Sequence, residues 1–317
     1  MSSHVLILPD VDRWFERNGI SIPGVVYDGE VFHMLYRSYS DLDRDMDWGY
    51  DAFWGCAVIG YAYSYDGVSF QRLNVPVLVP EKTYERCGVE DPRVTKLGDI
   101  YLMTYISLYR MGYPQISLTC LAYSADLINW IRLGAIDRYK GVAIFPEKIN
   151  GRYCALMRRF PNVVLGYSDD LITWHCPYRL LKPYETMPPE NALLPPRPGM
   201  WDSYSIAPGA PPVKTELGWL VFYNGFSLED RDRKIGLAVL DLDNPEKVIY
   251  RSRNPIIEPF DIPDSMRYLA KSRFSTYCCG AVKVDDEIFL YYGVCDTMIG
   301  VSRIKLSEIH RMIDEGR

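Results

Sequence analysis

The 317-residue chain is 48% hydrophobic and 14% aromatic, which is enough apolar material for a sizeable core. Its formal net charge is -6 at pH 7, and no run rich in lysine or arginine occurs, which argues against DNA or RNA as a partner. No apolar stretch approaches the roughly 20 residues that cross a bilayer, and no basic region precedes the apolar residues 5–8, so we expect neither a membrane span nor a signal peptide.

The eight cysteines are scattered along the chain, and none of them forms a Cys-x-x-Cys pair. Zinc and redox sites commonly use that spacing. Free thiols buried in a reducing compartment are the simpler interpretation. We therefore expect a cytoplasmic protein.

One pattern, a turn residue followed by an aromatic and β-branched run, occurs five times. The runs are residues 29–36, 98–105, 151–157, 218–223 and 286–292. Their composition and their turn-like start are typical of β-strands. A second run, rich in small and aliphatic residues, follows each of them. These second runs are residues 59–64, 121–124, 165–168, 235–240 and 299–302.

Three of the second runs end in Ser-x-Asp-(Gly or Leu)-x-x-(Phe or Trp), at residues 64–70, 124–130 and 168–174. The serine and the aspartate are expected to cap a turn, and the aromatic residue to open the next strand and pack between sheets. An amphipathic helix is expected only near residues 306–313.

The repeat predicts an all-β chain, because its spacing of about 50 to 70 residues suits one four-stranded blade plus loops. Five repeats predict a five-bladed β-propeller. No linker rich in proline or glycine divides the sequence, so residues 1–317 are expected to form a single domain. The competing interpretation is a β-sandwich or an irregular pair of sheets.

The most unusual local sequence is Gly-Val-Glu-Asp-Pro-Arg at residues 88–93, immediately before a predicted strand. Proline biases the preceding Asp91 toward an extended backbone, and the donors of Arg93 can hold a carboxylate or a sugar hydroxyl. This arrangement would present a fixed acid. A surface Asp-Pro turn with a solvent-exposed salt bridge is the alternative.

Further candidates lie at equivalent strand ends, which converge if the propeller is right. These are Arg37, Tyr105, Arg158, Arg159, Asn224 and Asp296. Glu190 and Glu229 add acids on loops that flank the fourth repeat, although either one alone is more often a solvated loop residue. Carboxylates, arginines and aromatic rings together are what a sugar requires, because sugars offer hydroxyls to polar groups and C–H faces to rings.

Other chemistries have little support in the sequence. There are only four histidines, with no His-x-x-x-His or His/Cys cluster, so neither a metal site nor another cofactor is expected. A Gly-x-Ser-x-Gly motif and a glycine-rich phosphate loop are both absent.

Five ordered segments resemble glycoside hydrolase family 130, and the resemblance covers nearly the whole chain. They are residues 59–67, 88–93, 145–151, 211–220 and 291–300. The resemblance implies a five-bladed propeller. It also implies a β-mannoside as substrate, with Asp91 as the general acid that acts through a hydroxyl of the bound mannose.

The family contains inverting phosphorylases, which use inorganic phosphate, and β-1,2-mannosidases, which use water. This sequence departs from the phosphorylases at two cations: Ser205 stands where they have a lysine, and Asn224 where they have a histidine. Losing two cations weakens a site for a dianion, although Arg158 and Arg159 remain. Glu190 and Glu229 match the glutamate pair with which the hydrolases activate water, and an inverting hydrolase needs such a base roughly 6.5–9.5 Å from its acid.

The sequence therefore predicts, first, an inverting β-1,2-mannosidase that releases mannose from manno-oligosaccharides, with Asp91, Glu190 and Glu229 as catalytic residues. The sugar is expected to contact the arginines and Asn224, Tyr105 and Asp296 named above. The second hypothesis is a β-mannoside phosphorylase that forms mannose 1-phosphate, with inorganic phosphate as co-substrate. The third is a sugar-binding propeller without catalysis. A homo-oligomer is compatible with the sequence.

Overall fold

The computed structural model describes residues 5–40, 56–110, 116–176, 192–259 and 275–316. In these residues the chain forms β-strands, one α-helix and one short 3-10 helix, so the all-β prediction is confirmed. No helix in this part of the chain is long and apolar enough to cross a membrane. All eight cysteines are free thiols, and most of them are buried.

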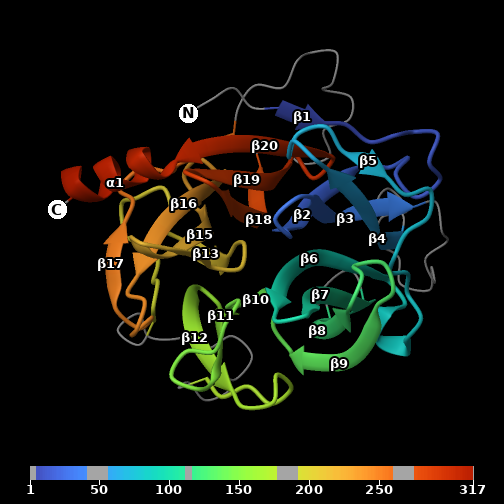
Figure 1. The fold of residues 1–317 in the computed structure, drawn as a ribbon, viewed down its shortest axis with the longest axis horizontal. Coiled ribbons are helices and arrows are strands. Elements are labelled where there is room, and N and C mark those ends of the chain that lie inside the picture. Colours follow the sequence, from blue (N-terminus) through green and yellow to red (C-terminus); the bar gives the residue numbers. More distant parts are fainter. Residues whose placement is uncertain (1–4, 41–55, 111–115, 177–191, 260–274, 317) are drawn as a thin grey trace.

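The strands form five consecutive groups in chain order, numbered 1 to 5 (Figure 1). Group 1 contains β2 (Ile20–Tyr27), β3 (Phe32–Ser40), β4 (Cys56–Ser64) and β5 (Gln71–Arg72). Group 2 contains β6 (Gly88–Leu97), β7 (Ile100–Arg110), β8 (Ile116–Ser124) and β9 (Ile131–Asp137), and the 3-10 helix η1 (Thr83–Glu85) precedes it. Group 3 contains β10 (Val142–Ile144), β11 (Tyr153–Arg159) and β12 (Asn162–Ser168).

Group 4 contains β13 (Ser205–Pro208), β14 (Val213–Thr215), β15 (Gly218–Phe226), β16 (Arg233–Leu240) and β17 (Val248–Arg251). Group 5 contains β18 (Thr276–Val284), β19 (Glu287–Val294) and β20 (Met298–Lys305), and the helix α1 (Leu306–Glu315) follows it. Strand β1 (Val5–Ile7), from the other end of the chain, pairs with β20 and completes group 5.

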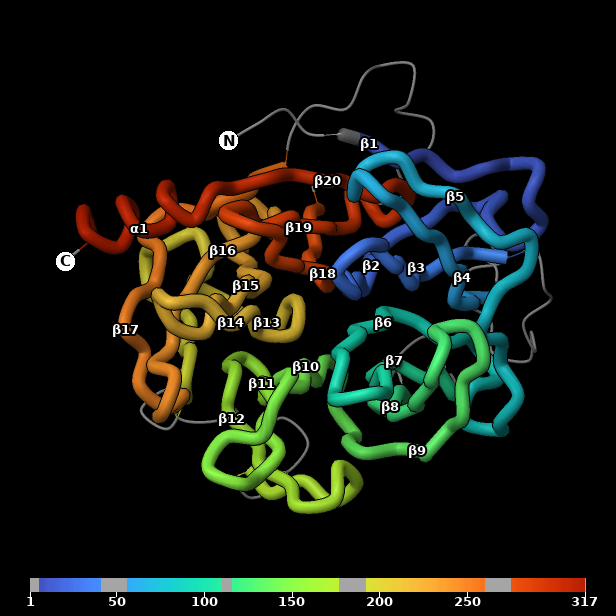
Figure 2. The backbone as a smooth tube through the Cα atoms, viewed as in Figure 1, coloured from blue at the N-terminus to red at the C-terminus, as the bar shows by residue number. Residues whose placement is uncertain are grey.

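The strands expected from the repeat are present, but each group begins with a strand that the sequence analysis missed. The first runs of the repeat are β3, β7, β11, β15 and β19, and the second runs are β4, β8, β12, β16 and β20. The missed strands, β2, β6, β10, β13 and β18, lie nearest the common centre in Figures 1 and 2 and are called the inner strands. The segment 88–93 is thus part of a strand and does not precede one.

The pairing gives four sheets in the described residues, where the repeat predicted five. Groups 1 and 2 merge into one eight-stranded sheet through a single parallel pair, Ala57 with Gly88. Gly88 has a φ of +131°, and a Cβ there would lie 2.9 Å from the backbone nitrogen of Ala57. The merging therefore depends on a close approach that glycine permits.

Five hydrophobic cores lie between neighbouring groups, one for each pair: 1 with 2, 2 with 3, 3 with 4, 4 with 5, and 5 with 1. Strand β15 shows how the sequence builds two of them. Leu220 and Phe222 face group 5, whereas Trp219, Val221 and Tyr223 face group 3. Because strand side chains alternate between two buried faces, every position of the run is apolar.

The predicted Ser-x-Asp turns are confirmed in groups 1, 2 and 3. In the first, the hydroxyl of Ser64 accepts a hydrogen bond from the N–H of Gly67, and the carboxylate of Asp66 accepts bonds from the N–H groups of Val68 and Ser69. Equivalent bonds form around Asp126 and Asp170. These turns close the hairpins at the end of each group opposite to where its inner strand begins.

Candidate functional site

Arg37 of β3 is the centre of a network of charged groups that joins groups 1, 2 and 5. Its Nη1 atom lies 2.9 Å from Oδ1 of Asp91 in β6, and its Nη2 atom lies 2.8 Å from Oδ1 of Asp296 in the hairpin between β19 and β20. The ring centroid of Tyr39 lies 4.9 Å from the same guanidinium. Three residues that the sequence predicted as site residues are thus in direct contact.

Glu90 and Lys140 extend this network toward group 3. Oε2 of Glu90 lies 3.8 Å from Nη1 of Arg37 and 3.7 Å from Nζ of Lys140, which precedes the inner strand β10. Glu90 is buried, so its charge needs these partners. We call Arg37, Glu90, Asp91, Lys140 and Asp296 the acid cluster.

The backbone of the acid cluster is strained at both aspartates. Asp91 has a φ of +53° and Asp296 a φ of +54°. The extended backbone predicted for Asp91 is therefore wrong, because a β-bulge places Asp91 and Pro92 together opposite the single residue Tyr105. Such strain costs about 1–3 kcal/mol per residue and is concentrated at functional sites.

Arg93 connects the inner strands of groups 2 and 4. Its Nε atom donates to the carbonyl of Gly209 at 2.8 Å, Nη2 donates to the carbonyl of Pro208 at 3.1 Å, and Nη1 donates to the carbonyl of Asp91 at 3.3 Å. The sequence predicted that these donors would hold a carboxylate or a sugar hydroxyl. Three backbone carbonyls occupy most of them instead.

Arg158 at the end of β11 belongs to a second charged group, and it pairs with no carboxylate of the described residues. Burial lowers the pKa of Arg158, and the positive charges of Arg233 and Arg93 lower it further. Its buried Nε atom has no hydrogen-bond partner in the described part of the chain. We call Arg93, Arg158 and Arg233 the arginine cluster.

Tyr277 of β18 links the two clusters. It interacts electrostatically with Arg93, Arg158 and Asp91, and burial raises its pKa. The phenol therefore stays protonated at neutral pH and can donate a hydrogen bond. A site that combines fixed carboxylates with an arginine cluster can hold both a polyhydroxylated ligand and an anion.

Arg159 points away from both clusters. Its Nη1 atom lies 2.7 Å from Oδ2 of Asp137, and its guanidinium packs over the ring of Tyr139 at 4.7 Å. Neighbouring side chains of a strand face opposite sides, so Arg158 and Arg159 cannot serve one site. The structure thus separates two residues that the sequence treated together.

Asn224 uses its amide to hold the fold together. Its Oδ1 atom accepts a hydrogen bond from the N–H of Cys278 at 2.8 Å, and Nδ2 donates to the carbonyls of Cys278 at 3.1 Å and Pro208 at 3.3 Å. These bonds tie β15 to the inner strands of groups 4 and 5. The side chain predicted to contact the sugar is therefore occupied by backbone groups.

Tyr105 also has a structural environment. It is fully buried in the core between groups 1 and 2, and its hydroxyl donates to Oε1 of Glu85 at 2.7 Å. Arg132 pairs with the same carboxylate at 3.1 Å. The sequence placed Tyr105 at the sugar, but the side chain faces away from the acid cluster into this core.

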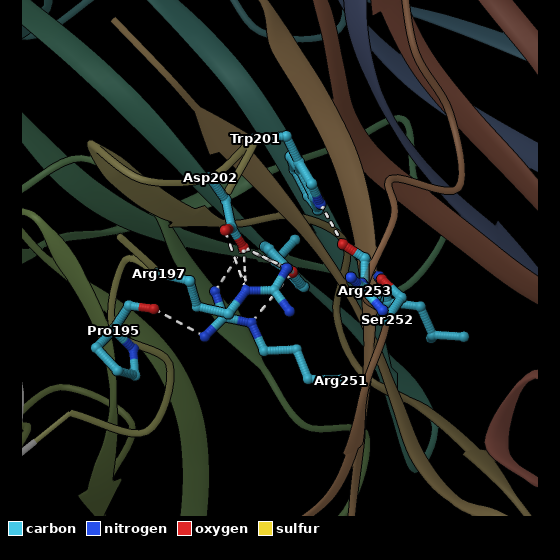
Figure 3. A network of polar contacts seen from close by, with 9 residues as sticks. Pro195, Arg197, Trp201, Asp202, Arg251, Ser252 and Arg253 are labelled. Carbon is cyan, nitrogen blue, oxygen red and sulfur yellow. Dashed lines mark hydrogen bonds and ion pairs between the residues drawn. The ribbon is translucent and has the colours of Figure 1, made fainter. Parts of the chain in front are cut away.

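The same acid, tyrosine and arginine arrangement recurs in two other groups. In group 1 it consists of Glu16, Tyr36 and Arg72, and in group 4 of Asp202, Tyr223 and Arg251. Figure 3 shows the group 4 member, in which Arg197 and Arg251 converge on the carboxylate of Asp202. In each arrangement the acid lies in the segment before an inner strand, and the tyrosine and the arginine lie on later strands of the same group. Tyr105 is therefore one of three equivalent structural tyrosines.

Replacing Tyr105 with phenylalanine is therefore expected to lower the free energy of unfolding by about 1–3 kcal/mol, because buried Glu85 loses a donor. The kcat/KM on β-1,2-mannobiose, the substrate expected from the sequence, should stay within about twofold of the wild-type value. Urea unfolding and initial rates measure the two effects. Tyr36→Phe is the matched control and should behave alike. A large loss of kcat/KM for Tyr105→Phe with unchanged stability would contradict the structural role and support a contact between Tyr105 and the sugar.

Of the two predicted glutamates only Glu229 lies in the described part of the chain, and its one hydrogen bond there is not with Asp91. Glu229 lies in the hairpin between β15 and β16, where its side chain is exposed. Its N–H donates to the hydroxyl of Ser227 at 3.1 Å. Glu190 lies outside the described residues.

Sequence analysis missed five residues of the site: Tyr39, Glu90, Lys140, Arg233 and Tyr277. Tyr39 could have been found, because it lies two residues beyond Arg37 and therefore on the same face of the strand. Lys140 and Tyr277 lie at the beginning of inner strands that the sequence analysis did not recognise. Nothing in the sequence marks Arg233, the first residue of β16.

The chain was compared with known proteins. A family model described as β-1,4-mannooligosaccharide phosphorylase matches residues 21–315. Among curated proteins, a 1,2-β-oligomannan phosphorylase of Thermoanaerobacter sp. (strain X514) is 35% identical over 313 residues, which cover 98% of this chain and 97% of the relative. A β-1,2-mannobiose phosphorylase of the same organism is 33% identical over 312 residues, with coverage of 98% and 97%.

Among solved structures, the chain is similar to β-1,2-mannobiose phosphorylase from Listeria innocua in complex with β-1,2-mannobiose. The TM-score is 0.73 at 27% identity, and the match covers 99% of this chain and 94% of that chain. The similarity in sequence and in structure thus extends over nearly the whole length.

Proposed function

The chain belongs to glycoside hydrolase family 130, and from this premise we propose that it is a phosphorylase that cleaves β-1,2-linked manno-oligosaccharides with inorganic phosphate. The names of the two Thermoanaerobacter relatives support phosphorolysis and the β-1,2 linkage alike. The β-1,4 linkage in the description of the family model has no such support among these two relatives. Hydrolysis, the first expectation from the sequence, thereby gives way to its alternative.

The arginine cluster is the observation that favours phosphate over water. Arg158 lies beside two other cations, and its pKa is lowered by burial and by their charges. Holding three cations close together is costly, and a dianion reduces that cost while accepting charge-assisted hydrogen bonds. Arg158 and Arg233 would thus supply the charge that Ser205 and Asn224 do not.

The proposed reaction uses both the acid cluster and the arginine cluster, which Tyr277 links. A phosphate oxygen attacks the anomeric carbon, and the bond from that carbon to the leaving sugar oxygen breaks. Asp91, by its resemblance to the family's acid, delivers the proton to the leaving oxygen through a mannose hydroxyl. Inversion converts the β-mannoside into α-mannose 1-phosphate and an oligosaccharide shorter by one mannose.

Arg37 would keep the acid in place. It contacts Asp91 and Asp296 at 2.9 and 2.8 Å, so the two strained aspartates hold one geometry relative to each other. Rigid placement of reacting groups is a major source of catalysis, because the cost of ordering them is met before the substrate binds. Asp296, with its carboxylate partly exposed, is the group we assign to a sugar hydroxyl.

We assign the five strand groups as the blades of one five-bladed propeller domain over residues 1–317, because each group shares a core with the next and group 5 shares one with group 1. Free cysteines favour a cytoplasmic location. Inorganic phosphate is a co-substrate, and the chemistry needs no metal.

The test is incubation of the purified protein with β-1,2-mannobiose, with and without inorganic phosphate, and chromatography of the products. We expect equal amounts of mannose and mannose 1-phosphate with phosphate, and almost no turnover without it. Mannose formed equally in both conditions would establish the hydrolase. Binding without turnover would establish the non-catalytic alternative.

A further inference from the structure

Three aromatic rings form a partly exposed strip between groups 3 and 4. Phe160 lies in the hairpin between β11 and β12, Tyr204 directly precedes β13, and Phe226 ends β15. The ring centroids of Phe160 and Tyr204 are 5.7 Å apart, and those of Tyr204 and Phe226 are 5.8 Å apart. We call these three residues the aromatic strip.

The aromatic strip is more exposed than the aromatic residues of the cores. Phe160 is 41% exposed and Tyr204 is 42% exposed, whereas many aromatic residues of the cores, such as Tyr223, are fully buried. Contiguous exposed apolar surface that is bordered by polar groups commonly marks a binding site. Both contacts in the strip are edge-to-face, so the edge of one ring covers at most one face of the next.

Backbone hydrogen bonds fix the strip in position. The N–H of Tyr204 donates to the carbonyl of Phe226 at 2.9 Å, and the N–H of Ile206 donates to the carbonyl of Pro161 at 2.8 Å. The segment at Tyr204 is therefore tied to the end of β15, and the hairpin that carries Phe160 is tied to β13. A platform that is ordered before binding loses less entropy when a ligand arrives.

The strip is continuous with the arginine cluster. The guanidinium of Arg158 lies 6.0 Å from the ring centroid of Phe160, and that of Arg233 lies 5.2 Å from the ring centroid of Phe226. These two arginines also interact with each other. Ring faces that can pack against sugar C–H groups thus lie directly beside the arginines assigned to phosphate.

We propose that the aromatic strip binds mannose units of a longer substrate chain, beyond the two units that flank the bond being cleaved. This inference rests on the proposed function. The occupant is a pyranose ring, because its C–H faces match the electron-rich faces of the aromatic rings, whereas Arg158 and Arg233 are assigned to phosphate. The strip gives the enzyme a preference for β-1,2-mannotetraose over β-1,2-mannobiose.

The test compares phosphorolysis of these two substrates by the wild type, Phe160→Ala, Tyr204→Ala and the double variant. We expect kcat/KM on the tetraose to fall about tenfold in the double variant, through KM, and kcat/KM on the biose to stay within about threefold. The matched control is Tyr65→Ala. Tyr65 is 72% exposed and also makes an edge-to-face contact, with Tyr63, but it follows β4 at the opposite end of group 1. It should change neither substrate.

Two outcomes would overturn the inference while leaving the proposed function intact: an active wild type whose strip variants act on the tetraose normally, or variants that lose the biose and the tetraose equally. An inactive wild type would instead contradict the proposed function. Calorimetric titration of Asp91→Asn with the tetraose gives an independent measure. The double change Phe160→Ala/Tyr204→Ala in that background should weaken binding of the tetraose about tenfold and leave binding of the biose nearly unchanged.

Discussion

Asp91→Asn is expected to lower kcat for phosphorolysis of β-1,2-mannobiose by about 10³-fold, because an amide cannot deliver the proton that the leaving oxygen needs. The change is nearly isosteric and keeps an acceptor for Arg37, which lies 2.9 Å from the carboxylate. The affinity for mannobiose should therefore change by less than about fivefold. Initial rates and calorimetric titration measure the two effects separately.

Asp169→Asn is the matched control for this variant. Asp169 lies in an exposed ion pair with Arg152, away from the acid cluster, and the same change of acid to amide there should leave kcat unaltered. If Asp91→Asn retained more than about a tenth of the wild-type kcat, another group would have to be the acid. The strained backbone of residue 91 would then need a different explanation.

Arg158→Met is expected to raise the KM for phosphate by about 10- to 100-fold, because a charge-assisted contact to a dianion is lost. The affinity for mannobiose should be nearly unchanged. The melting temperature should not fall, since Arg158 is a partly buried cation whose pKa is lowered by burial and by the charges of Arg233 and Arg93. Rates over a phosphate series and thermal unfolding test the two statements together.

The neighbouring residue supplies the control. Arg159→Met removes the partner of Asp137, which lies 2.7 Å away, and should cost about 1–3 kcal/mol of stability without changing the KM for phosphate. The two arginines are adjacent in the sequence and face opposite sides of β11. Equal effects of the two changes on the KM for phosphate would contradict the placement of the anion at the arginine cluster.

The strands that correspond to the runs of the repeat could be predicted, because most of their residues are apolar on both faces. In β15 the residues from Trp219 to Tyr223 are all apolar, and the other runs of the repeat are largely apolar, with exceptions such as His33 and Thr104. A glycine lies opposite each of Tyr36, Tyr223 and Tyr292, and its lack of a side chain admits the ring. This contact explains the Ile-Gly that begins three of the five second runs of the repeat, at residues 59, 235 and 299.

The inner strands could not be predicted in the same way. Strand β2 contains Pro23 and Gly24, and β6 contains Pro92, which are residues that normally argue against a strand. Bulges accommodate both prolines, next to Ile22 and Asp91, which have positive φ. The crowding of inner strands near the common centre makes these irregularities necessary, and only the assembled fold reveals it.

The site was predictable where the repeat fixes the face of a residue. Arg37, Arg158 and Asn224 each follow the large side chain that ends a run, namely Tyr36, Met157 and Tyr223, and all three face inward. Tyr105 corresponds to Tyr36 in the same alignment, so the repeat itself could have assigned it to the core. Whether an inward side chain is free or held by backbone groups, as in Asn224, depends on neighbours from distant parts of the chain.

The central claim is that phosphate, not water, attacks the mannoside. Phosphorus NMR of the protein with β-1,2-mannobiose and inorganic phosphate tests it most directly, because it follows the consumption of phosphate and the anomer of the product in one sample. The account predicts a signal of α-mannose 1-phosphate that grows as the phosphate signal falls. Disappearance of mannobiose with an unchanged phosphate signal would contradict it.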